Sequence, residues 1–492
     1  MSKENKSEHW YSEQGVQEDL QRQLHLFKSL IQNSLTISVS LRDNYYKNTA
    51  KFVRALRNNL RKSSPVIKTC TVANTKWSEL QGEVVTFIDG GIGRAKIANP
   101  APILLRVGSY CVRTGERNLA EREKFGYYPI ILGDLVGGDK QRADFPDIVR
   151  ITAELLGGLA ALKRTPDLRV LMFHGPLVYT VPFYMGHIPF TEQDVDLFLH
   201  HYAHDQNQAQ QLKKDFLKEA QIDIYPRLAD DRSDEWVRRR LFEPLSWMAF
   251  LYRRLIEEAS QRTPRPIIAG IVERGELREF SETVLLENAF RRLRQKNQAD
   301  YFNQIFGRTD LTSPKALLDK LHYTDSILLG MLLEQGQYSE AWEIDKYRGF
   351  RQGKVSLPGE TGSDDVDFTV LRPGEIGFPR VNGCYVKVSD TTEPFRIEVF
   401  DALGPDQIPQ AVTRAYLYAQ MLPGYGFPVG LDVADKFARV PQWLTDAYSK
   451  EIRYKLGISL QNGEISDAEM RRILIRDMYM TQRDWLFRPD TE

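Results

Sequence analysis

The stretch EVVTFIDGGIGRAKIANPAPILLRVGSYCVRTG, residues 83–115, decides the fold. Its first apolar run reaches Asp89 and is followed directly by two glycines. Its second run, PILLRVGSYCVR, is short, apolar and rich in residues that favour β-structure. We therefore expect two consecutive strands, the first ending at Asp89. An aspartate before two glycines usually marks a turn, but a carboxylate at the end of a buried strand can also be presented to a ligand.

Further strand patterns follow this pair. YYPIILGDL (residues 127–135) predicts a third strand, and LRVLMFHG (168–175) predicts a fully buried one. Between them, residues 144–167 place apolar side chains on one helical face and end in a basic pair followed by Thr-Pro, a helix stop signal. Three strands, a helix and another strand predict a mixed α/β sheet with a crossover helix. Late strands are expected in 265–275, 383–390 and 394–402.

The rest of the chain reads mainly as helix. Helical spacing covers residues 10–64, a polar block at 191–262 that we interpret as an insertion, 282–350, and most of the last 45 or so residues, whereas 353–367 reads as a loop. The second N-terminal helix carries several basic side chains between Lys51 and Lys62. They form a solvated helix face or, as the alternative, one wall of a nucleic-acid channel.

Composition excludes several classes of protein. The 492 residues are 42% hydrophobic and 27% charged, which is typical of globular domains. Three widely spaced cysteines argue against a disulfide framework and a cysteine-based zinc site, and they fit a reducing cytosol. The polar N-terminus has no apolar signal core and no apolar run approaches a membrane span, so we expect a cytoplasmic protein. With 66 basic and 66 acidic residues, nucleic acid would have to be held by local basic patches.

Four side chains are candidates for one polar site. Asp89 ends the first strand, His174 ends the strand after the crossover helix, Glu154 lies at the edge of that helix's apolar arc, and Asp435 lies near the start of a later helix. Carboxylates brought together without partners repel one another, and a divalent cation relieves that cost. Mg²⁺ and Mn²⁺ prefer such oxygen ligands. Taken singly, each residue also fits an ordinary turn or surface position.

The order of short motifs resembles the NurA nuclease family, whose core is RNase H-like. FIDGG at Asp89 matches the family's opening strand, which ends in Asp-Gly-Ser. RITAELLGG with Glu154 resembles its acid-bearing helix, and LMFHGPL resembles its second strand, of the type Leu-Leu-Asp-Gly-Ser-Leu. Weaker matches, in the right order, are IIAGIVER, YTDSILLGMLLEQGQYS, YVKV with FRIEVF, and GYGFPVGLDVADKFARV, which places Asp435 at a ligand position. The resemblance covers roughly residues 80–445.

The resemblance implies a metal-dependent deoxyribonuclease that forms a homodimer and works with a hexameric HerA-type ATPase, in DNA end processing or defence against foreign DNA. The ligands and catalytic residues would be Asp89, Glu154, His174 and Asp435 around Mn²⁺ or Mg²⁺. His174 stands where the family has aspartate, which favours Mn²⁺, because imidazole is a poor Mg²⁺ ligand. The same departure leaves open a catalytically impaired scaffold that binds DNA and the ATPase. Phe427 stands where the family often has an aromatic hydroxyl.

The expected organisation is a helical region at 1–79, a nuclease domain at 80–445 with the insertion, and a helical segment at 446–492. Arg274 and Arg94 are candidates to bind substrate phosphates, and a surface salt bridge is the alternative for Arg274. The chain has no GxxxxGK[ST] signature, so a partner would supply ATP hydrolysis. His200 and His204 lie one helical turn apart, but without a neighbouring HExxH glutamate or cysteine we interpret them as part of a solvated helix.

Overall fold

The structure is a computed structural model of the chain. It describes residues 17, 21, 24–60, 66–69, 77–94, 103–132, 139–179, 192–202, 206–219, 244–344, 354–356, 365–367, 379–422 and 424–476. Two compact units are present: the first comprises Met1–Val66 and Ser281–Tyr323, and the second comprises Ile67–Phe280 and Thr324–Glu492. The second unit contains the sheet.

A mixed sheet of ten strands forms the centre of the second unit, in the order β1-β7-β11-β12-β6-β5-β2-β3-β4 with β8 paired to β11. Its strands are β1 (Ile67–Thr69), β2 (Val84–Arg94), β3 (Ile103–Arg113), β4 (Glu123–Leu132), β5 (Leu168–His174), β6 (Ile267–Val272), β7 (Gln337–Ser339), β8 (Trp342–Glu343), β11 (Val381–Val386) and β12 (Phe395–Phe400). The predicted mixed α/β sheet is thus confirmed.

The three central strands run parallel, because a helix returns the chain across the sheet. Strands β2, β3 and β4 form an antiparallel meander. Helix α6 (Asp139–Arg164) then leads into β5, which lies parallel to β2 with Phe173 opposite Ile88, and β6 lies parallel to β5. The predicted crossover helix is therefore present. The carboxyl ends of the three parallel strands meet at one edge of the sheet, where ligands bind in many open α/β sheets.

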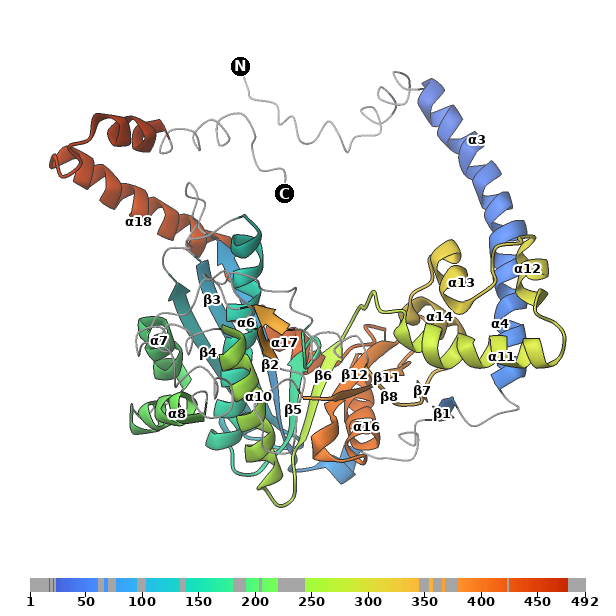
Figure 1. Ribbon diagram of the computed structural model, residues 1–492, viewed down its shortest axis with the longest axis horizontal. Helices are drawn as coiled ribbons and strands as arrows, with labels where there is room; N and C mark the ends of the chain where they lie inside the picture. Colours follow the sequence, from blue (N-terminus) through green and yellow to red (C-terminus); the bar gives the residue numbers. More distant parts are fainter. Residues whose placement is uncertain are drawn as a thin grey trace. The chain divides into compact units, whose positions relative to one another are not determined.

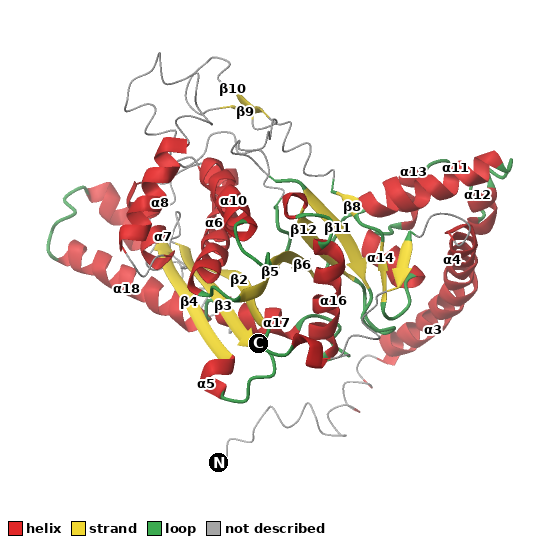
Figure 2. Ribbon diagram, turned by 90° about the horizontal axis from the view of Figure 1, so that it is seen from below, coloured by secondary structure: helices red, strands yellow, loops and turns green. Residues whose placement is uncertain are grey.

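Helices cover both faces of the sheet (Figure 2). Helices α6 and α10 lie on one face, while α16 and α17 lie on the other. The apolar core beneath α16 and α17 collects alternate residues of neighbouring strands, such as Val85, Phe87, Val170 and Met172. The other helices of this unit pack around these layers. Their bounds are η3 (Trp77–Leu80), α5 (Leu119–Arg122), α7 (Glu192–Tyr202), α8 (Gln206–Glu219), α10 (Pro244–Ser260), α14 (Asp325–Leu332), η6 (Asp401–Leu403), α16 (Gln407–Gln420), α17 (Val429–Ala438) and α18 (Gln442–Gln461).

Strand β2 does not end at Asp89, as the sequence predicts, but continues through the two glycines to Arg94. The glycines serve helix packing. A Cβ atom at Gly91 would overlap the carbonyl oxygen of Ala438 on α17, and one at Gly90 would lie 2.7 Å from Arg150 Cγ on α6. Because glycine has no side chain, both helices can approach the strand closely.

The first unit is helical. It contains α3 (Leu24–Ser40), η1 (Leu41–Tyr46), α4 (Lys47–Leu60), η5 (Ser281–Leu286), α11 (Glu287–Gln295), α12 (Tyr301–Phe306) and α13 (Pro314–Leu321). Phe52 on α4 is fully buried and its ring lies 5.2 Å from that of Phe302 on α12. The predicted N-terminal helices are thus present, and α4 packs with α11 and α12.

Two local predictions are wrong. Residues 282–350 are not helical throughout, because α14 ends at Leu332 and the short strands β7 and β8 follow. Gly336 at φ +79° makes the turn into β7, which pairs with β1 and β11. The predicted loop at 353–367 contains two three-residue strands, β9 (Lys354–Ser356) and β10 (Asp365–Asp367), that pair with each other. The predicted domain boundaries stay predictions.

Candidate metal centre

Asp89, His174 and Asp435 meet at the carboxyl edge of the parallel strands. One potential ligand atom from each of the three lies within 4.8 Å of the others. The three residues are distant in sequence and come from β2, β5 and α17. The structure therefore brings together three of the four candidates for the polar site.

Strand register and helix packing place these side chains. Because Ile88 lies opposite Phe173 in the parallel β2–β5 pair, Asp89 and His174 follow next to each other. Asp435 reaches them because α17 lies almost directly on the backbone of β2 and β3. A Cβ atom at Gly108 of β3 would be 2.8 Å from the amide nitrogen of Ala438 on α17. Glycines in the sheet thus set the distance between α17 and the two strand residues.

Asp89 and His174 form a direct pair. His174 Nδ1 lies 3.1 Å from Asp89 Oδ2, and Asp89 Oδ1 accepts a hydrogen bond from the Gly90 amide. Burial opposes protonation of the imidazole, but the hydrogen bond and the negative charge of Asp89, with the charge of Asp435, outweigh it and raise the pKa of His174. The ring of buried Phe427 lies 5.4 Å from the imidazole ring, so one side of His174 faces an apolar wall.

Asp435 is the more accessible carboxylate of the group. Its side chain is 33% exposed and forms an ion pair with Arg439 at 3.1 Å, one turn further along α17. The Arg439 side chain is itself 74% exposed, and exposed pairs of this kind contribute little stability. Asp435 can therefore exchange this partner for a ligand at small cost.

Glu154 lies close by but on the other face of the sheet. It packs over Gly90 from α6, is almost fully buried, and pairs with Arg150 at 2.6 Å. Burial raises the pKa of Glu154, opposed mainly by Arg150, and the negative charge of Asp89 adds to the rise. Glu154 is not part of the three-residue group. Its predicted role as a ligand stays a prediction.

Arg150 and Tyr179 link this acid to the backbone of His174. Arg150 Nη1 donates to the Tyr179 hydroxyl at 3.4 Å, and that hydroxyl donates to the carbonyl oxygen of His174 at 3.3 Å. The Arg150 guanidinium also lies over the Tyr179 ring, 5.0 Å from its centroid. These contacts could not be predicted from the sequence, because Tyr179 lies beyond the strand in a segment without regular spacing.

A buried carboxylate on β12 fixes the turn that follows His174. Glu398 is fully buried, pairs with Arg396 at 2.8 Å, and accepts a hydrogen bond from the Leu177 amide at 2.9 Å. Gly175 makes the turn at φ +109°, and its amide donates to the carbonyl of Ile271. The turn is therefore held from β6 and β12. The two charged residues within the apolar FRIEVF strand were the available sequence signal.

The two arginines predicted to bind phosphate lie at or beyond the carboxyl ends of two parallel strands. Arg94 is exposed at the end of β2, and Arg274 follows two residues after the end of β6. The Arg274 side chain is 85% exposed, 3.9 Å from Glu273. Arg94 thus lies five residues beyond Asp89 along β2, and Arg274 lies beyond the end of β6; their role in binding stays a prediction.

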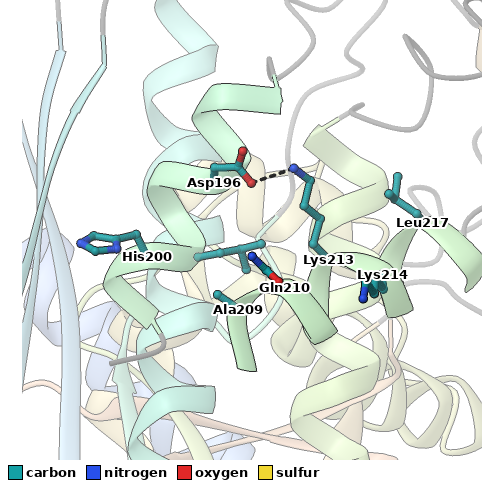
Figure 3. A pocket seen from close by; sticks show the side chains of 8 residues that line it. Asp196, His200, Ala209, Gln210, Lys213, Lys214 and Leu217 are labelled. Atoms are coloured by element: carbon teal, nitrogen blue, oxygen red, sulfur yellow. Dashed lines mark hydrogen bonds and ion pairs between the residues drawn. The ribbon is translucent and has the colours of Figure 1, made fainter. Parts of the chain in front are cut away.

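A cavity of about 610 Å³ lies between α7 and α8, away from the metal centre (Figure 3). Lys213 spans it and pairs with Asp196 at 2.7 Å and with Glu192 at 2.9 Å. His200 lines this cavity, whereas His204 lies outside the described residues. Asp196 and Lys213 pair with each other there, and neither helix carries a residue of the three-residue group.

The donor set fits a divalent transition metal. Two carboxylates and an imidazole combine the oxygen ligands that Mn²⁺ and Mg²⁺ prefer with a nitrogen ligand that Mn²⁺ tolerates better. Among the described residues, Asp89 forms an ion pair with the His174 ring, and Asp435 forms one with the exposed Arg439. Two carboxylates thus share one imidazole and one exposed arginine, and a bound cation would add positive charge where the carboxylates meet.

The part of the chain that holds this site matches the model of a protein family. The model of the NurA domain matches residues 83–440, which include every residue described above as part of the site or its support. The chain belongs to the NurA family. The resemblance seen in the sequence is confirmed, and membership of the NurA family supports a nuclease activity for the chain.

Several solved NurA structures are similar to the chain at low identity. The crystal structure of the NurA nuclease from Sulfolobus solfataricus is 13% identical, with 89% of this chain and 97% of that chain covered and a TM-score of 0.45. A crystal structure of NurA bound to dAMP and manganese is 10% identical, with 85% and 94% covered and a TM-score of 0.35. Curated protein sequences gave no match. None of the helices in the described ranges is long and apolar enough to cross a membrane.

Proposed function

We propose that the chain is a metal-dependent deoxyribonuclease of the NurA family that uses Mn²⁺ in preference to Mg²⁺. One observation carries the proposal: Asp89, His174 and Asp435 place their potential ligand atoms within 4.8 Å of one another. A divalent ion held there supplies an activated water and neutralises charge that develops on a phosphodiester. DNA as the substrate is supported by the family and by the dAMP in a similar NurA structure.

The residues of the chain have distinct parts in this proposal. Asp89 orients the His174 imidazole through the contact at 3.1 Å and is itself fixed by the Gly90 amide. Phe427 keeps water from one side of that imidazole. Arg94 and Arg274 are candidates to contact a phosphate, since both side chains are exposed. Arginine suits this role because its guanidinium pairs with two phosphate oxygens.

The proposal includes partners. The family resemblance supports a homodimer and a HerA-type hexameric ATPase, and the chain has no phosphate-binding GxxxxGK[ST] signature of its own. In this proposal the ATPase moves DNA into the nuclease in the cytoplasm, during end processing or defence against foreign DNA. A second candidate function is a non-cleaving scaffold for DNA and the ATPase. It is favoured by His174, which replaces an aspartate of the resembled family.

Incubation with linear DNA tests the nuclease against the scaffold. Purified chain, alone and with the ATPase, is given Mn²⁺, Mg²⁺ or EDTA. The nuclease predicts cleavage in Mn²⁺, weaker cleavage in Mg²⁺ and none in EDTA. Absence of cleavage in both metals, with DNA binding retained and the ATPase present, supports the scaffold. Cleavage that persists in Asp89→Asn shows that the site lies elsewhere.

A further inference from the structure

Glu154 stands next to the metal centre, but its carboxylate is already occupied. It approaches the sheet from α6, which packs beside α10 (Figure 1). A Cβ atom at Gly90, the residue after Asp89, would overlap Glu154 Oε1, so this oxygen lies against the strand that carries Asp89. The same oxygen accepts a hydrogen bond from Arg150 Nη1 at 2.6 Å. A metal ion that used this oxygen would therefore have to displace the guanidinium.

Arg150 is held in this position from several sides. Its Nε atom lies 3.5 Å from the Asp147 carboxylate, and its Nη1 atom donates to the Tyr179 hydroxyl at 3.4 Å. The guanidinium also lies over the Tyr179 ring, 5.0 Å from the ring centroid. Rotation of the guanidinium away from Glu154 would break these contacts together, so the Arg150–Glu154 pair is a fixed part of the fold.

The charge of Arg150 disfavours a divalent ion at Glu154. A guanidinium is not deprotonated in proteins, so it would stay positive beside the incoming ion. Displacement would also leave Arg150 largely buried without its anion, and breaking a buried pair in this way is strongly destabilising. In the described part of the chain, one group of three acid or histidine side chains is arranged to hold an ion, and Glu154 is not in it. The centre thus offers one ion site and one fixed positive charge.

We propose that the metal centre holds a single Mn²⁺ and that Arg150 takes the place of a second ion. The guanidinium balances the charge of Glu154, and a bound Mn²⁺ balances Asp89 and Asp435. Arg150 is then a positioning residue that keeps Glu154 out of the ligand shell of the ion. This role of Arg150 rests on the metal site of the proposed function, but it does not require that the chain cleave DNA.

Counting the Mn²⁺ bound to the purified full chain tests this role. Metal-free protein is titrated with MnCl₂, and electron paramagnetic resonance measures the Mn²⁺ that stays free. Wild type should bind one Mn²⁺ more than Asp89→Asn, which loses a proposed ligand. Arg150→Gln releases the Glu154 carboxylate and should bind a second Mn²⁺. Addition of Glu154→Gln removes that carboxylate and should return the count to one, with an affinity within about threefold of wild type.

A matched control and a second variant separate this effect from a change of fold. Arg253→Gln is the control, because Arg253 pairs with Glu257 at the same helical spacing on α10, 2.8 Å apart. Its Mn²⁺ count should equal that of wild type. The double variant Arg150→Gln, Glu154→Gln replaces the ion pair by two amides that can hydrogen-bond to each other. It therefore carries the test even if Arg150→Gln alone does not fold, and thermal unfolding without metal shows which variants are folded.

Several results would overturn this role of Arg150. Wild type that binds two Mn²⁺ more than Asp89→Asn has a second ion despite the guanidinium. A folded Arg150→Gln variant that still binds one Mn²⁺ shows that Arg150 excludes nothing. A loss of affinity of about tenfold or more in the double variant identifies Glu154 as a ligand.

The Mn²⁺ count also separates this role from the proposed function. Wild type that binds no more Mn²⁺ than Asp89→Asn removes the metal site, and the role of Arg150 and the proposed function fall together. Wild type that binds one Mn²⁺ but leaves linear DNA intact keeps the role of Arg150 and favours the scaffold.

Discussion

The buried carboxylates around the sheet differ in the groups that balance their charge. On the face of α6 and α10, Glu398 is paired with Arg396 at 2.8 Å and Glu154 with Arg150 at 2.6 Å. Glu83 is likewise paired with Arg414 of α16 at 2.7 Å, whereas Asp89, at the metal centre, is paired with the His174 imidazole at 3.1 Å. The first arrangement balances each negative charge with a buried arginine. The second leaves a surplus of negative charge at an accessible edge, and this difference separates a structural network from a site that requires a cation.

The largest expected effect comes from removal of one carboxylate of the unbalanced group. Asp435→Asn should reduce cleavage of linear DNA to the level without metal, because the amide lacks the charge that holds the ion. Asp432→Asn is the matched control: Asp432 lies on the same helix and pairs with exposed Lys436 at 3.0 Å. Cleavage rates measured in Mn²⁺ compare the two. Equal rates in both variants would remove Asp435 from the site.

Loss of an arginine from a buried arginine–glutamate pair should instead lower the stability of the fold. Arg396→Met leaves Glu398 buried without its cation and should lower the free energy of unfolding by about 3–5 kcal/mol. Arg113→Met breaks a pair of similar length in the same unit, 2.6 Å from Asp167, with side chains 39% and 55% exposed. This control should change stability by about 1 kcal/mol or less. Urea unfolding measures both, and similar losses would refute the distinction between the buried pair and the exposed one.

A change of ligand type sharpens the comparison further. His174→Asp makes all three donors carboxylates, which Mg²⁺ accepts more readily than imidazole. The ratio of the cleavage rate in Mg²⁺ to that in Mn²⁺ should rise about tenfold, equivalent to about 1.4 kcal/mol. Initial rates in the two metals give the ratio. An unchanged ratio would mean that His174 does not contact the ion.

The smallest expected effect is the change of stability with pH, which should have opposite signs without metal and with bound Mn²⁺. Without metal, the raised pKa of His174 adds stability that is complete below the unfolded pKa and is lost as pH rises through the folded pKa. The stabilisation caused by Mn²⁺ should grow over the same pH interval, because imidazole must be deprotonated to bind a metal. Thermal unfolding with and without Mn²⁺ measures both slopes. Asp89→Asn should flatten them.

Much of this architecture could be predicted from the sequence, because local patterns carry it. The apolar runs predict β2, β5 and β12, and apolar side chains on a single helical face predict the crossover helix α6. The proximity of Asp89 and His174 could be predicted because a crossover makes strands parallel and aligns their carboxyl ends. These inferences need only the order of elements and the direction of neighbouring strands.

Contacts between distant segments could not be predicted. Glu154 was expected at the rim of the buried side, yet the missing side chain of Gly90 lets it pack against β2. The pairs that Glu398 makes depend on the register of β12 with β6 and on the turn at Gly175, neither of which has a local pattern. The spacing of α3 predicts a helix with an apolar face, but spacing alone does not show whether that face is buried, and the described side chains of α3 are exposed.

Close packing of α17 has a consequence for sequence variation. Every amino acid other than glycine carries a Cβ atom, so each missense change at Gly91 or Gly108 places an atom against the α17 backbone. Asp435 would move with its helix even though no ligand had been replaced. These two codons should therefore tolerate substitution as poorly as the codon for Asp89, and loss-of-function alleles recovered from a random library should include them.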